Sequence, residues 1–594
     1  MRLSASFFIV CLFVSLVVSS SREAKAQQES NPKREGPKRE GAITGRVIAD
    51  GRPVAGAQVV VHPAVGKLFD DQDQTSASDE DGAFKVTGLS PGAYFLSTRM
   101  PGYVASSDSS GDSSGARLHR IGENVAITLI KGGVITGRVT DEFGEPMVGA
   151  RVTAFRVRTL EGRPDLDSNV MDASDAGRET DDRGVYRIFG LEPGIYVVSL
   201  NGLPFSAPGL AQPRNEPQVY HPSSTRNAAA EITVISGGET SGVDIRHRAM
   251  RGHSIGGAVS GATEGRGIIN AVSVMLLRAA DRQPVAAATT LTGEKNFSLR
   301  GVEDGEYDLV ALRFTEDMDF SASVPRRVTI RGADISGIDV KLLKLSSIEG
   351  RVAIEPSKQR DACKSEDDFS IGEILLTARR DEKTPSLFAA LASLEAPMGV
   401  GRTAPGDDGA FVLKNIEPGR VRVEADLPGE NWYVRAITQK SSAATKPTNP
   451  MDASQNGVEV KSGEKVSGVE LTIAEGAASL RGKIVPTNEN AKLPKRIRVH
   501  LIPAEMTAAN EALRYYEIIA NNDGSFDLKN LAPGRYLLRL RASEENESAA
   551  NPDRPVAWDA IERSKLRREA EALKIEVELK PCQRVKDHIL RWQP

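Results

Sequence analysis

The chain has 594 residues, 40% of them hydrophobic and 26% charged, with a formal net charge of −4 at pH 7. The apolar fraction is that of a folded protein, which excludes wholesale disorder. A slightly acidic chain lacks the basic surface that binds nucleic acid, so we expect no nucleic-acid partner. At ~150 residues per domain, the length predicts about four domains.

The N-terminus has the organisation of a secretory signal peptide. Arg2 supplies a positive charge, residues 7–18 are an apolar stretch, and residues 24–26 (Ala-Lys-Ala) have the small-x-small pattern of a cleavage site. The apolar stretch is shorter than the ~20 residues that span a bilayer, and no later stretch is long enough. We therefore predict a signal peptide over 1–26 and a polar linker over 27–41. The mature chain, without a transmembrane segment, is expected to be secreted, periplasmic or at the cell surface.

Two cysteines remain in the predicted mature chain. Cys11 lies within the signal peptide, whereas Cys363 and Cys582 follow it. In an exported protein these two can form a disulfide or stay as separate thiols, because sequence alone cannot place their Cα atoms within ~7 Å. Two cysteines in so long a chain are not a disulfide scaffold. Hydrophobic cores must therefore stabilise the fold.

One pattern of residues occurs five times along the chain. An aromatic residue is followed five positions later by an aliphatic residue, eight positions later by glycine and, in four copies, ten positions later by tyrosine. Alternating apolar and polar residues on both sides of the glycine predict two adjacent strands with one face in a core. The aromatic residues are Phe84, Tyr186, Phe297, Phe411 and Phe526, and the glycines are Gly92, Gly194, Gly305, Gly419 and Gly534.

The segment between these two strands predicts a tight turn. In the first copy it contains Leu89, Pro91 and Gly92, and in the third copy Asp304 replaces the proline. Proline fixes φ at about −65° and glycine accepts a positive φ, so we expect Pro91 and Gly92 at the centre of a type II turn. Leu89 is expected to close the end of the core beneath it.

Each copy also has an opening strand with a central glycine, and three copies have a recognisable closing strand. About six to eight short strands over ~90–130 residues predict a small β-sandwich for each copy. The fold class is therefore predicted as all-β, with five tandem antiparallel β-sandwiches of the prealbumin-like or immunoglobulin-like type and a few short helical insertions. The predicted domains are 42–131, 132–249, 250–345, 346–475 and 476–594.

Three short helices are expected to interrupt the strands. They cover 387–396, 504–513 and 559–573, and the last is rich in good helix formers. We expect the charged residues of the last helix to face solvent. These residues are Glu562, Arg563, Lys565, Arg567, Arg568 and Glu569.

The motifs resemble those of the carboxypeptidase regulatory-like domain. They are Thr-Gly-Arg-Val in the opening strand, then Gly-Ala-x-Val, Asp-Gly-x-Phe and Leu-x-Pro-Gly-x-Tyr. The resemblance covers most of 42–580 and is best in the first, second and fifth copies. It implies a sandwich similar to Cna B-type and prealbumin-like domains, in an exported bacterial surface or periplasmic protein. Such domains are often grouped with carbohydrate-binding folds, although fold alone does not determine function.

No catalytic motif accompanies the repeats. The seven histidines form no His-Glu-x-x-His pattern, and neither a Gly-x-Ser-x-Gly elbow nor a phosphate-binding loop is present. We therefore predict a protein that is not an enzyme, without catalytic residues, metal or cofactor. Trp432, Tyr433 and Trp558 are the aromatic residues left for stacking on a sugar, although packing is the commoner role of such residues.

These features favour a non-catalytic exported scaffold or binding protein of the cell envelope or extracellular space. One alternative is a carbohydrate-binding protein with a starch-binding-like fold. Another is an accessory subunit of an export or polymer-degrading system. The expected partners are glycans or cell-envelope proteins.

Overall fold

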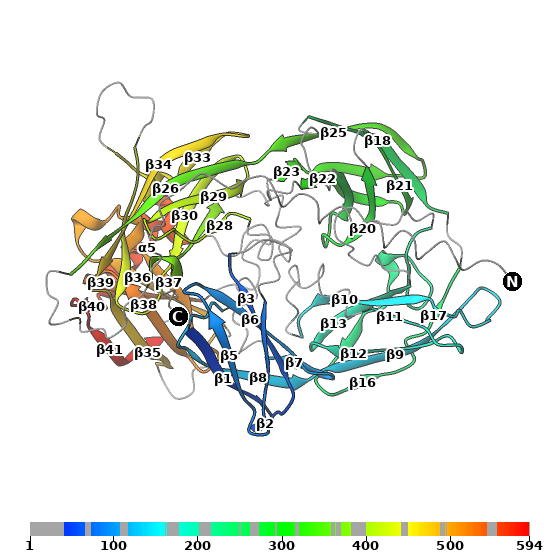
Figure 1. Ribbon diagram of the computed structural model, residues 1–594, viewed down its shortest axis with the longest axis horizontal. Helices are drawn as coiled ribbons and strands as arrows, with labels where there is room; N and C mark the ends of the chain where they lie inside the picture. The colour runs from blue at the N-terminus through cyan, green and yellow to red at the C-terminus, as the bar shows by residue number, and fades with distance from the viewer. Residues whose placement is uncertain are drawn as a thin grey trace, which may run out of the picture. The chain divides into compact units, whose positions relative to one another are not determined.

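The computed structural model shows a chain built almost entirely of β-strands (Figure 1). Among the described residues, five segments each have a hydrophobic core of their own. We call them module 1 (41–131), module 2 (133–246), module 3 (253–344), module 4 (346–475) and module 5 (478–592). The described residues are 41–65, 73–106, 117–160, 162, 177–200, 216–248, 251–261, 272–290, 294–314, 320–357, 363, 370–381, 400–440, 450–487, 493–494, 496–542 and 555–592.

Module 1 is a sandwich of two sheets. Its strands are β1 (Gly41–Ala49), β2 (Arg52–Pro53), β3 (Gln58–Pro63), β4 (Gln74–Ala77), β5 (Ala83–Leu89), β6 (Tyr94–Arg99), β7 (Tyr103–Ala105) and β8 (Asn124–Lys131). The larger sheet has the order β2-β1-β8-β7, with β5 on the other edge of β1, and the smaller has the order β4-β3-β6. Period-two alternation turns Phe84 and Val86 of β5 into the core.

Module 2 repeats this plan with two sheets. Its elements are β9 (Gly133–Thr140), β10 (Arg151–Arg158), β11 (Gly177–Glu179), β12 (Val185–Leu191), β13 (Gly194–Leu200), β14 (Val219–Tyr220), η2 (Arg226–Ala228), β15 (Ile232–Val234), β16 (Glu239–Thr240) and β17 (Ile245–Arg246). One sheet has the order β12-β9-β16, with β17 also on β9. The other has the order β11-β10-β13-β14, with β15 on β13.

Module 3 joins its two layers into one continuous sheet, because β23 pairs with both β22 and β25. Its strands are β18 (His253–Gly261), β19 (Val272–Arg278), β20 (Pro284–Thr290), β21 (Asn296–Val302), β22 (Gly305–Phe314), β23 (Phe320–Ser323), β24 (Arg326–Ile330) and β25 (Ile335–Lys344). The sheet order is β20-β19-β22-β23-β25-β18-β21, with β24 on β22.

Module 4 is again a two-sheet sandwich. Its elements are β26 (Ser346–Glu355), η3 (Ile371–Glu373), β27 (Leu375–Arg380), β28 (Arg402–Thr403), β29 (Ala410–Ile416), β30 (Gly419–Asp426), β31 (Trp432–Gln439), β32 (Met451–Asp452), α4 (Ala453–Asn456), β33 (Val458–Val460) and β34 (Lys465–Glu475). The sheets have the orders β29-β26-β34-β31-β32 and β28-β27-β30-β33.

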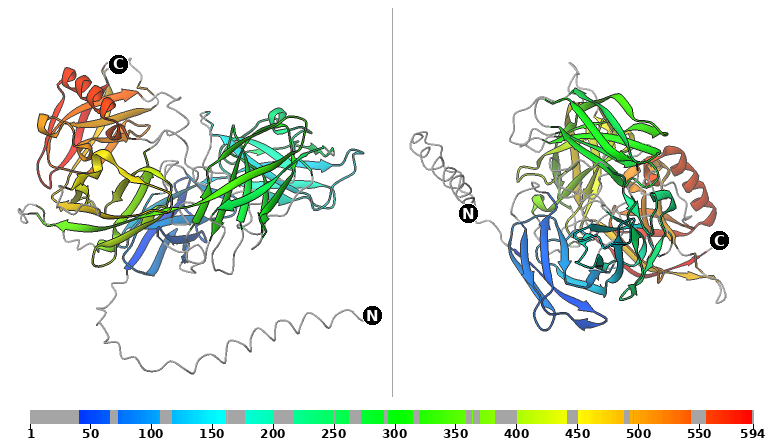
Figure 2. Two further views of the ribbon diagram at one scale, coloured as in Figure 1. Left: turned by 90° about the horizontal axis from the view of Figure 1, so that it is seen from above. Right: turned by 90° about the vertical axis from the view of Figure 1, so that its right-hand side faces the viewer.

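Module 5 adds a helix to the plan. Its elements are β35 (Ala478–Pro486), β36 (Ile497–Pro503), η5 (Met506–Ala508), η6 (Ala512–Arg514), β37 (Tyr516–Ile519), β38 (Ser525–Leu531), β39 (Gly534–Ala542), η7 (Val556–Trp558), α5 (Ala560–Leu573), β40 (Glu576–Leu579) and β41 (Arg584–Trp592). The sheets are β38-β35-β41 and β37-β36-β39-β40. Leu566 and Ala570 of α5 pack on Ile502 and Leu537 of the second sheet (Figure 2).

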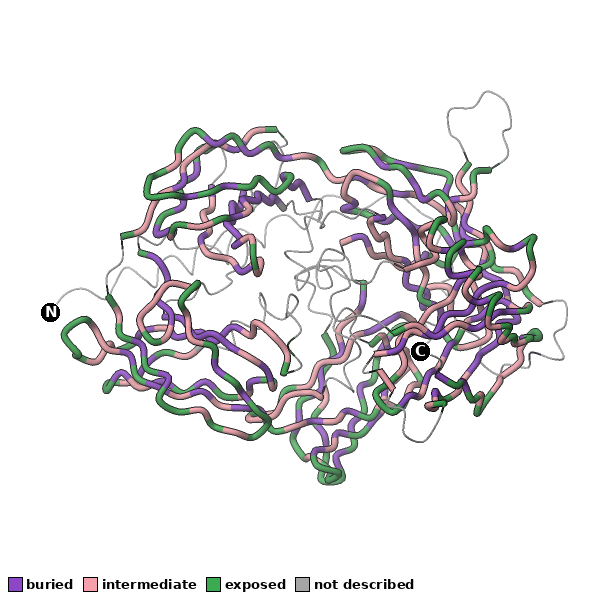
Figure 3. Tube along the Cα trace, turned by 180° about the vertical axis from the view of Figure 1, so that it is seen from behind, coloured by how far each residue is buried: buried purple, intermediate pink, exposed green. Residues whose placement is uncertain are grey.

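The predicted all-β fold of tandem sandwiches is confirmed, and the strands add one recurrent detail. The first and last strands of each module pair in parallel, as β1 does with β8 and β35 with β41. The whole module lies between these two strands, which is the long connection that a parallel pair requires. Buried residues follow the inner faces of the paired strands in every module (Figure 3).

The central glycine of each opening strand lies where no side chain fits. A Cβ on Gly257 would lie 2.0 Å from the Ile338 carbonyl oxygen of the parallel strand and 2.9 Å from Cζ of Phe297. The repeated aromatic ring therefore packs directly over a glycine, a known way of compensating a glycine in a strand. The same close approach recurs at Gly45, Gly137, Gly350 and Gly482, each within 2.2 Å of a carbonyl oxygen.

The type II turn predicted at Pro91 and Gly92 is wrong. Gly92 has no positive φ, whereas Gly88, four residues after the aromatic residue, has a φ of 76°. The equivalent positions have φ between 55° and 73°, and they are Gly190, Gly301, Asn415 and Asn530. The left-handed residue thus lies at the end of the first strand. Leu89 is buried in the core of module 1, as predicted.

The tyrosine of the pattern holds the turn closed. The Tyr94 hydroxyl donates a hydrogen bond to the Ser90 carbonyl oxygen, over 2.5 Å. Tyr196, Tyr307 and Tyr536 make the same bond to the residue four positions earlier. This is similar to the tyrosine corner of immunoglobulin-like sandwiches. At Gly305 a Cβ would lie 3.0 Å from the Tyr307 hydroxyl, so the glycine makes room for the ring.

The predicted helices have different outcomes. The helix predicted over 559–573 is present as α5, and the Asp559 carboxylate accepts hydrogen bonds from the first backbone N–H groups. The helix predicted over 504–513 is wrong, because only the 3₁₀ turns η5 and η6 form there. Ten residues are too few for an independent helix. The helix predicted over 387–396 and the signal peptide predicted over 1–26 lie outside the described residues.

The expectation of a fully solvated charged face on α5 is also wrong. Arg563 and Arg567 are buried, with 5% and 7% exposed. Arg567 donates hydrogen bonds to the carbonyl oxygens of Pro503 and Ala504, over 2.7 and 2.8 Å. Bonding to backbone carbonyls compensates the burial of a guanidinium, a contact that helical spacing alone does not reveal.

Candidate functional site at the junction of modules 4 and 5

The site residues selected from the sequence come together where module 4 meets module 5. Cys363, in the segment between β26 and β27, forms a disulfide with Cys582, in the turn between β40 and β41. Their Cα atoms are 5.3 Å apart, although 219 positions separate them in sequence. Cys363 is 5% exposed, so its sulfur is shielded from solvent. The bond joins two modules covalently.

Trp432 and Tyr433 lie at the start of β31, and backbone and side-chain contacts hold them in place. The Trp432 side chain packs against the core of module 4. Its carbonyl oxygen accepts a hydrogen bond from Nδ2 of Asn530 over 2.8 Å, and that same group donates to the Gly429 carbonyl oxygen over 2.9 Å. Burial raises the pKa of Tyr433. Both residues therefore contribute to packing at the junction.

Asn530 is the left-handed residue of the repeated turn, and its side chain reaches the preceding module. Asn415, at the equivalent place in module 4, accepts a hydrogen bond from the Phe320 N–H of module 3 over 2.9 Å. Asparagine tolerates this backbone conformation and also brings a hydrogen-bonding side chain. The turn of each of these modules is thus a docking point for its predecessor. Sequence analysis missed this role, although asparagine in place of glycine was a visible signal.

Trp558 belongs to module 5 but is held by arginines of module 4. The Cζ atoms of Arg379 and Arg422 lie 5.0 and 5.5 Å from the centre of its ring, within the range of cation–π attraction. Arg422 also donates to the Trp558 carbonyl oxygen over 3.2 Å. Guanidinium groups thus lie close to the ring that the sequence offered as a sugar-stacking surface.

Arg422 itself is anchored in the interior. Its Nε donates to the Asp381 carboxylate over 2.8 Å, and these two side chains are 5% and 2% exposed. Its other nitrogens donate to the carbonyl oxygens of Ser454 and Gln455. A buried ion pair is stable only when its remaining hydrogen-bonding groups are satisfied. The backbone carbonyls around Arg422 provide this satisfaction.

Glu430 is a second hub of the junction. It lies in the loop between β30 and β31 and faces three basic side chains of module 5. Nζ of Lys529 is 3.0 Å from its carboxylate and Nε of Arg584 is 3.6 Å away, while Arg481 donates a hydrogen bond to it. Burial alone would raise the pKa of Glu430, but these cations hold it below its ordinary value. Glu430 therefore stays ionised and attracts module 5.

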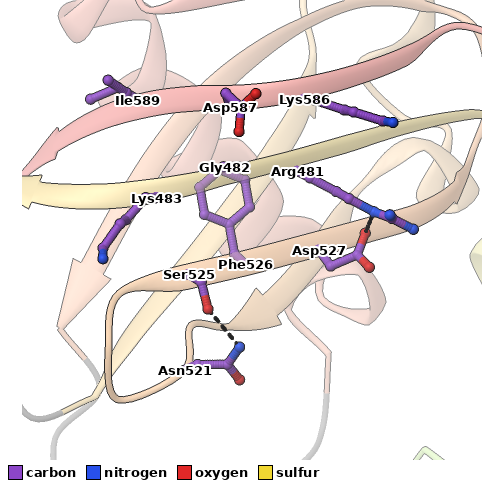
Figure 4. A pocket seen from close by; sticks show the side chains of 10 residues that line it. All are labelled: Arg481, Gly482, Lys483, Asn521, Ser525, Phe526, Asp527, Lys586, Asp587 and Ile589. Atoms are coloured by element: carbon purple, nitrogen blue, oxygen red, sulfur yellow. Dashed lines mark hydrogen bonds and ion pairs between the residues drawn. The ribbon is translucent and has the colours of Figure 1, made fainter.

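A shallow hollow of ≈ 580 Å³ lies beside this hub, on the outer face of the β38-β35-β41 sheet (Figure 4). Nε of Arg481 donates to the Asp527 carboxylate over 2.9 Å along its wall. Ile589 contributes an apolar side chain that is 64% exposed. The lining residues are Arg481, Gly482, Lys483, Asn521, Ser525, Phe526, Asp527, Lys586, Asp587 and Ile589. This lining can bind a mixed polar and apolar surface, and it pairs no nucleophile with a histidine.

One exposed aromatic ring escaped the sequence analysis. Phe143 lies in the turn between β9 and β10, and its side chain is 82% exposed. Asp141 fixes this turn by accepting the N–H groups of Phe143 and Glu145, each over 2.9 Å. The corresponding turn of module 1 is one residue shorter and has no aromatic residue. That insertion was the available signal.

Two structural features bear on the function classes considered above. Among the described residues, no group of three or more His, Cys, Asp or Glu side chains is arranged to hold a metal ion. In the same part of the chain, no helix has the length and apolar character needed to cross a bilayer.

Comparison with known proteins assigns the first module to a family. Residues 42–117 match the carboxypeptidase regulatory-like domain. No protein of curated function matches the chain.

Among solved structures, the chain is similar to three surface-type proteins at low identity. The Bacillus anthracis TIE protein is 14% identical over 51% of each chain, with a TM-score of 0.12. The minor pilin GBS52 of Streptococcus agalactiae is 16% identical over 35% of this chain and 96% of that chain, with a TM-score of 0.18. The shaft pilin SpaA of Lactobacillus rhamnosus GG is 10% identical over 36% and 100%, with a TM-score of 0.15. These scores carry no inference about function.

Proposed function

We propose that the protein is a non-catalytic, exported scaffold of the cell envelope or extracellular space. The observation that carries this proposal is the disulfide between Cys363 and Cys582. Disulfides form and persist in oxidising compartments outside the cytosol. A bond that links two modules across 219 positions serves to hold a multi-module chain together.

The chemistry of the junction supports a mechanical role. Arg422, Glu430 and Asn530 each use their polar groups to bind the neighbouring module. The rings of Trp432 and Trp558 are in contact with a core or with guanidinium groups. These contacts favour the scaffold over the carbohydrate-binding alternative, because a sugar platform needs an aromatic face free of protein. They likewise give no feature specific to an accessory subunit of another machine.

Fractionation of cells that produce the full chain tests the proposal. We expect the protein outside the cytoplasm, with a mature N-terminus close to residue 27, as read by N-terminal peptide mapping. A Cys582→Ser variant is the control, because it should be exported and processed equally while lacking the disulfide. Full-length chain retained in the cytoplasm, with residues 1–26 still attached, would contradict the proposal.

A further inference from the structure

Module 1 contacts module 4, although modules 2 and 3 lie between them in the chain. In β27 and just before it, Ile374 and Leu376 point into the core of module 4, so Leu375 must point outward. Leu375 is nevertheless only 3% exposed, because it packs with Ala64 and Ala93 of module 1. An apolar residue on the outer face of a strand is thus covered by another module.

Module 1 presents the complementary apolar surface. In β6, Tyr94 and Leu96 belong to the core of module 1, and Phe95 between them points to the other face. Phe95 packs with the cluster around Leu375. Cζ of Arg402, from module 4, lies 5.7 Å from the centre of the Phe95 ring. The interface therefore has an apolar centre with a cation at its margin, as protein interfaces commonly do.

Arg120 supplies the polar part of the contact. Its Nε donates to the Glu373 carbonyl oxygen over 3.2 Å, and Nη2 forms an ion pair with the Asp426 carboxylate. The Arg120 side chain is 12% exposed. Its backbone N–H donates to the Glu123 carboxylate over 3.1 Å, which fixes the turn that presents it. Both acceptors belong to module 4, so Arg120 has a defined place across the interface.

We propose that this contact is a reversible clasp that binds module 1 to module 4 within one chain. Leu375, Phe95 and Arg120 are outside the cores of their own modules, so both modules stay folded when the contact opens. Because the two surfaces are on one chain, their high effective concentration lets a small interface close. The Asp426 carboxylate is 51% exposed, so salt weakens the clasp. Modules 4 and 5, in contrast, are joined by a covalent bond. The clasp gives the scaffold a closed and an open state.

An Arg120→Glu variant of the full mature chain tests the clasp. It replaces attraction to Asp426 by repulsion, so we expect the ratio of closed to open molecules to fall by about tenfold or more, a factor equivalent to ~1.4 kcal/mol. Hydroxyl-radical footprinting should report increased modification of Leu375 and Phe95, and small-angle scattering should report a larger radius of gyration. Ile374 and Leu376 should stay protected, because they belong to the core of module 4.

Two further variants make the result specific. Adding Asp426→Arg to Arg120→Glu restores an ion pair of reversed polarity, and the footprint should return toward that of the unaltered chain. Arg52→Glu makes the same charge change at an exposed residue of β2 and should leave the footprint unchanged. The clasp is overturned if Arg120→Glu leaves the modification of Leu375 and the radius of gyration unaltered. It is equally overturned if the second substitution fails to reverse the opening.

Discussion

Replacing Gly257 by alanine is expected to lower the free energy of unfolding of module 3 by about 3 kcal/mol or more. The new Cβ would lie 2.0 Å from the Ile338 carbonyl oxygen and 2.9 Å from Cζ of Phe297. Neither neighbour can move cheaply, since one is backbone in a parallel strand pair and the other is a core ring. Urea unfolding followed by hydrogen exchange in β18 and β21 measures the loss.

The adjacent glycine provides a matched control in the same strand. A Cβ on Gly256 would have its nearest neighbours at 3.9 and 4.0 Å, which is ordinary van der Waals contact. Gly256→Ala should therefore change the stability of module 3 by less than about 1 kcal/mol, and the smaller entropy of its unfolded chain favours stabilisation. Equal losses for the two substitutions would show that the close approach at Gly257 does not determine the module's stability.

Replacing Arg422 by methionine is expected to cost about 3–5 kcal/mol at the junction of modules 4 and 5. The Asp381 carboxylate, 2% exposed, would lose its cation, and the carbonyl oxygens of Ser454, Gln455 and Trp558 would lose a donor. Hydroxyl-radical footprinting of Trp558, together with thermal unfolding of the full chain, measures the effect. We expect Trp558 to become accessible at a lower temperature than in the unaltered chain.

Arg379→Met is the control for this experiment. Arg379 also lies over the Trp558 ring, but its ion pair with Glu424 is about one-third exposed on both sides. Exposed ion pairs contribute little, so this substitution should cost no more than about 1 kcal/mol. The assigned role of the buried pair fails if the two substitutions weaken the junction equally, or if Arg422→Met leaves Trp558 protected.

The fold could be predicted because one pattern is repeated. An aromatic residue, an aliphatic residue and a glycine at constant spacing recur at Phe84 and Phe526, and both aromatic residues are buried in module cores. Period-two alternation then identifies the inner face of each strand. The turn was misassigned because Pro91 and Gly92 satisfy a local rule for type II turns. The tyrosine hydrogen bond that holds the turn is made across four residues and is invisible to that rule.

The junction could be predicted only in its residues and not in its contacts. Cys363, Trp432 and Trp558 were selected because their chemistry is unusual in this chain. Their meeting depends on how modules pack, which no local propensity encodes. Arg563 and Arg567 illustrate the same limit, since helical spacing places them among other charged residues while carbonyl groups of the neighbouring strand and loop bury them. Leu375 likewise lies on the outer face of a strand and is covered by another module.

Mass spectrometry of peptides from the non-reduced, mature protein tests the central claim most directly. The account predicts one peptide pair joined through Cys363 and Cys582, which separates into two peptides on reduction. Recovery of both cysteines as free thiols, alkylated without prior reduction, would contradict both the covalent junction of modules 4 and 5 and the export inferred from it.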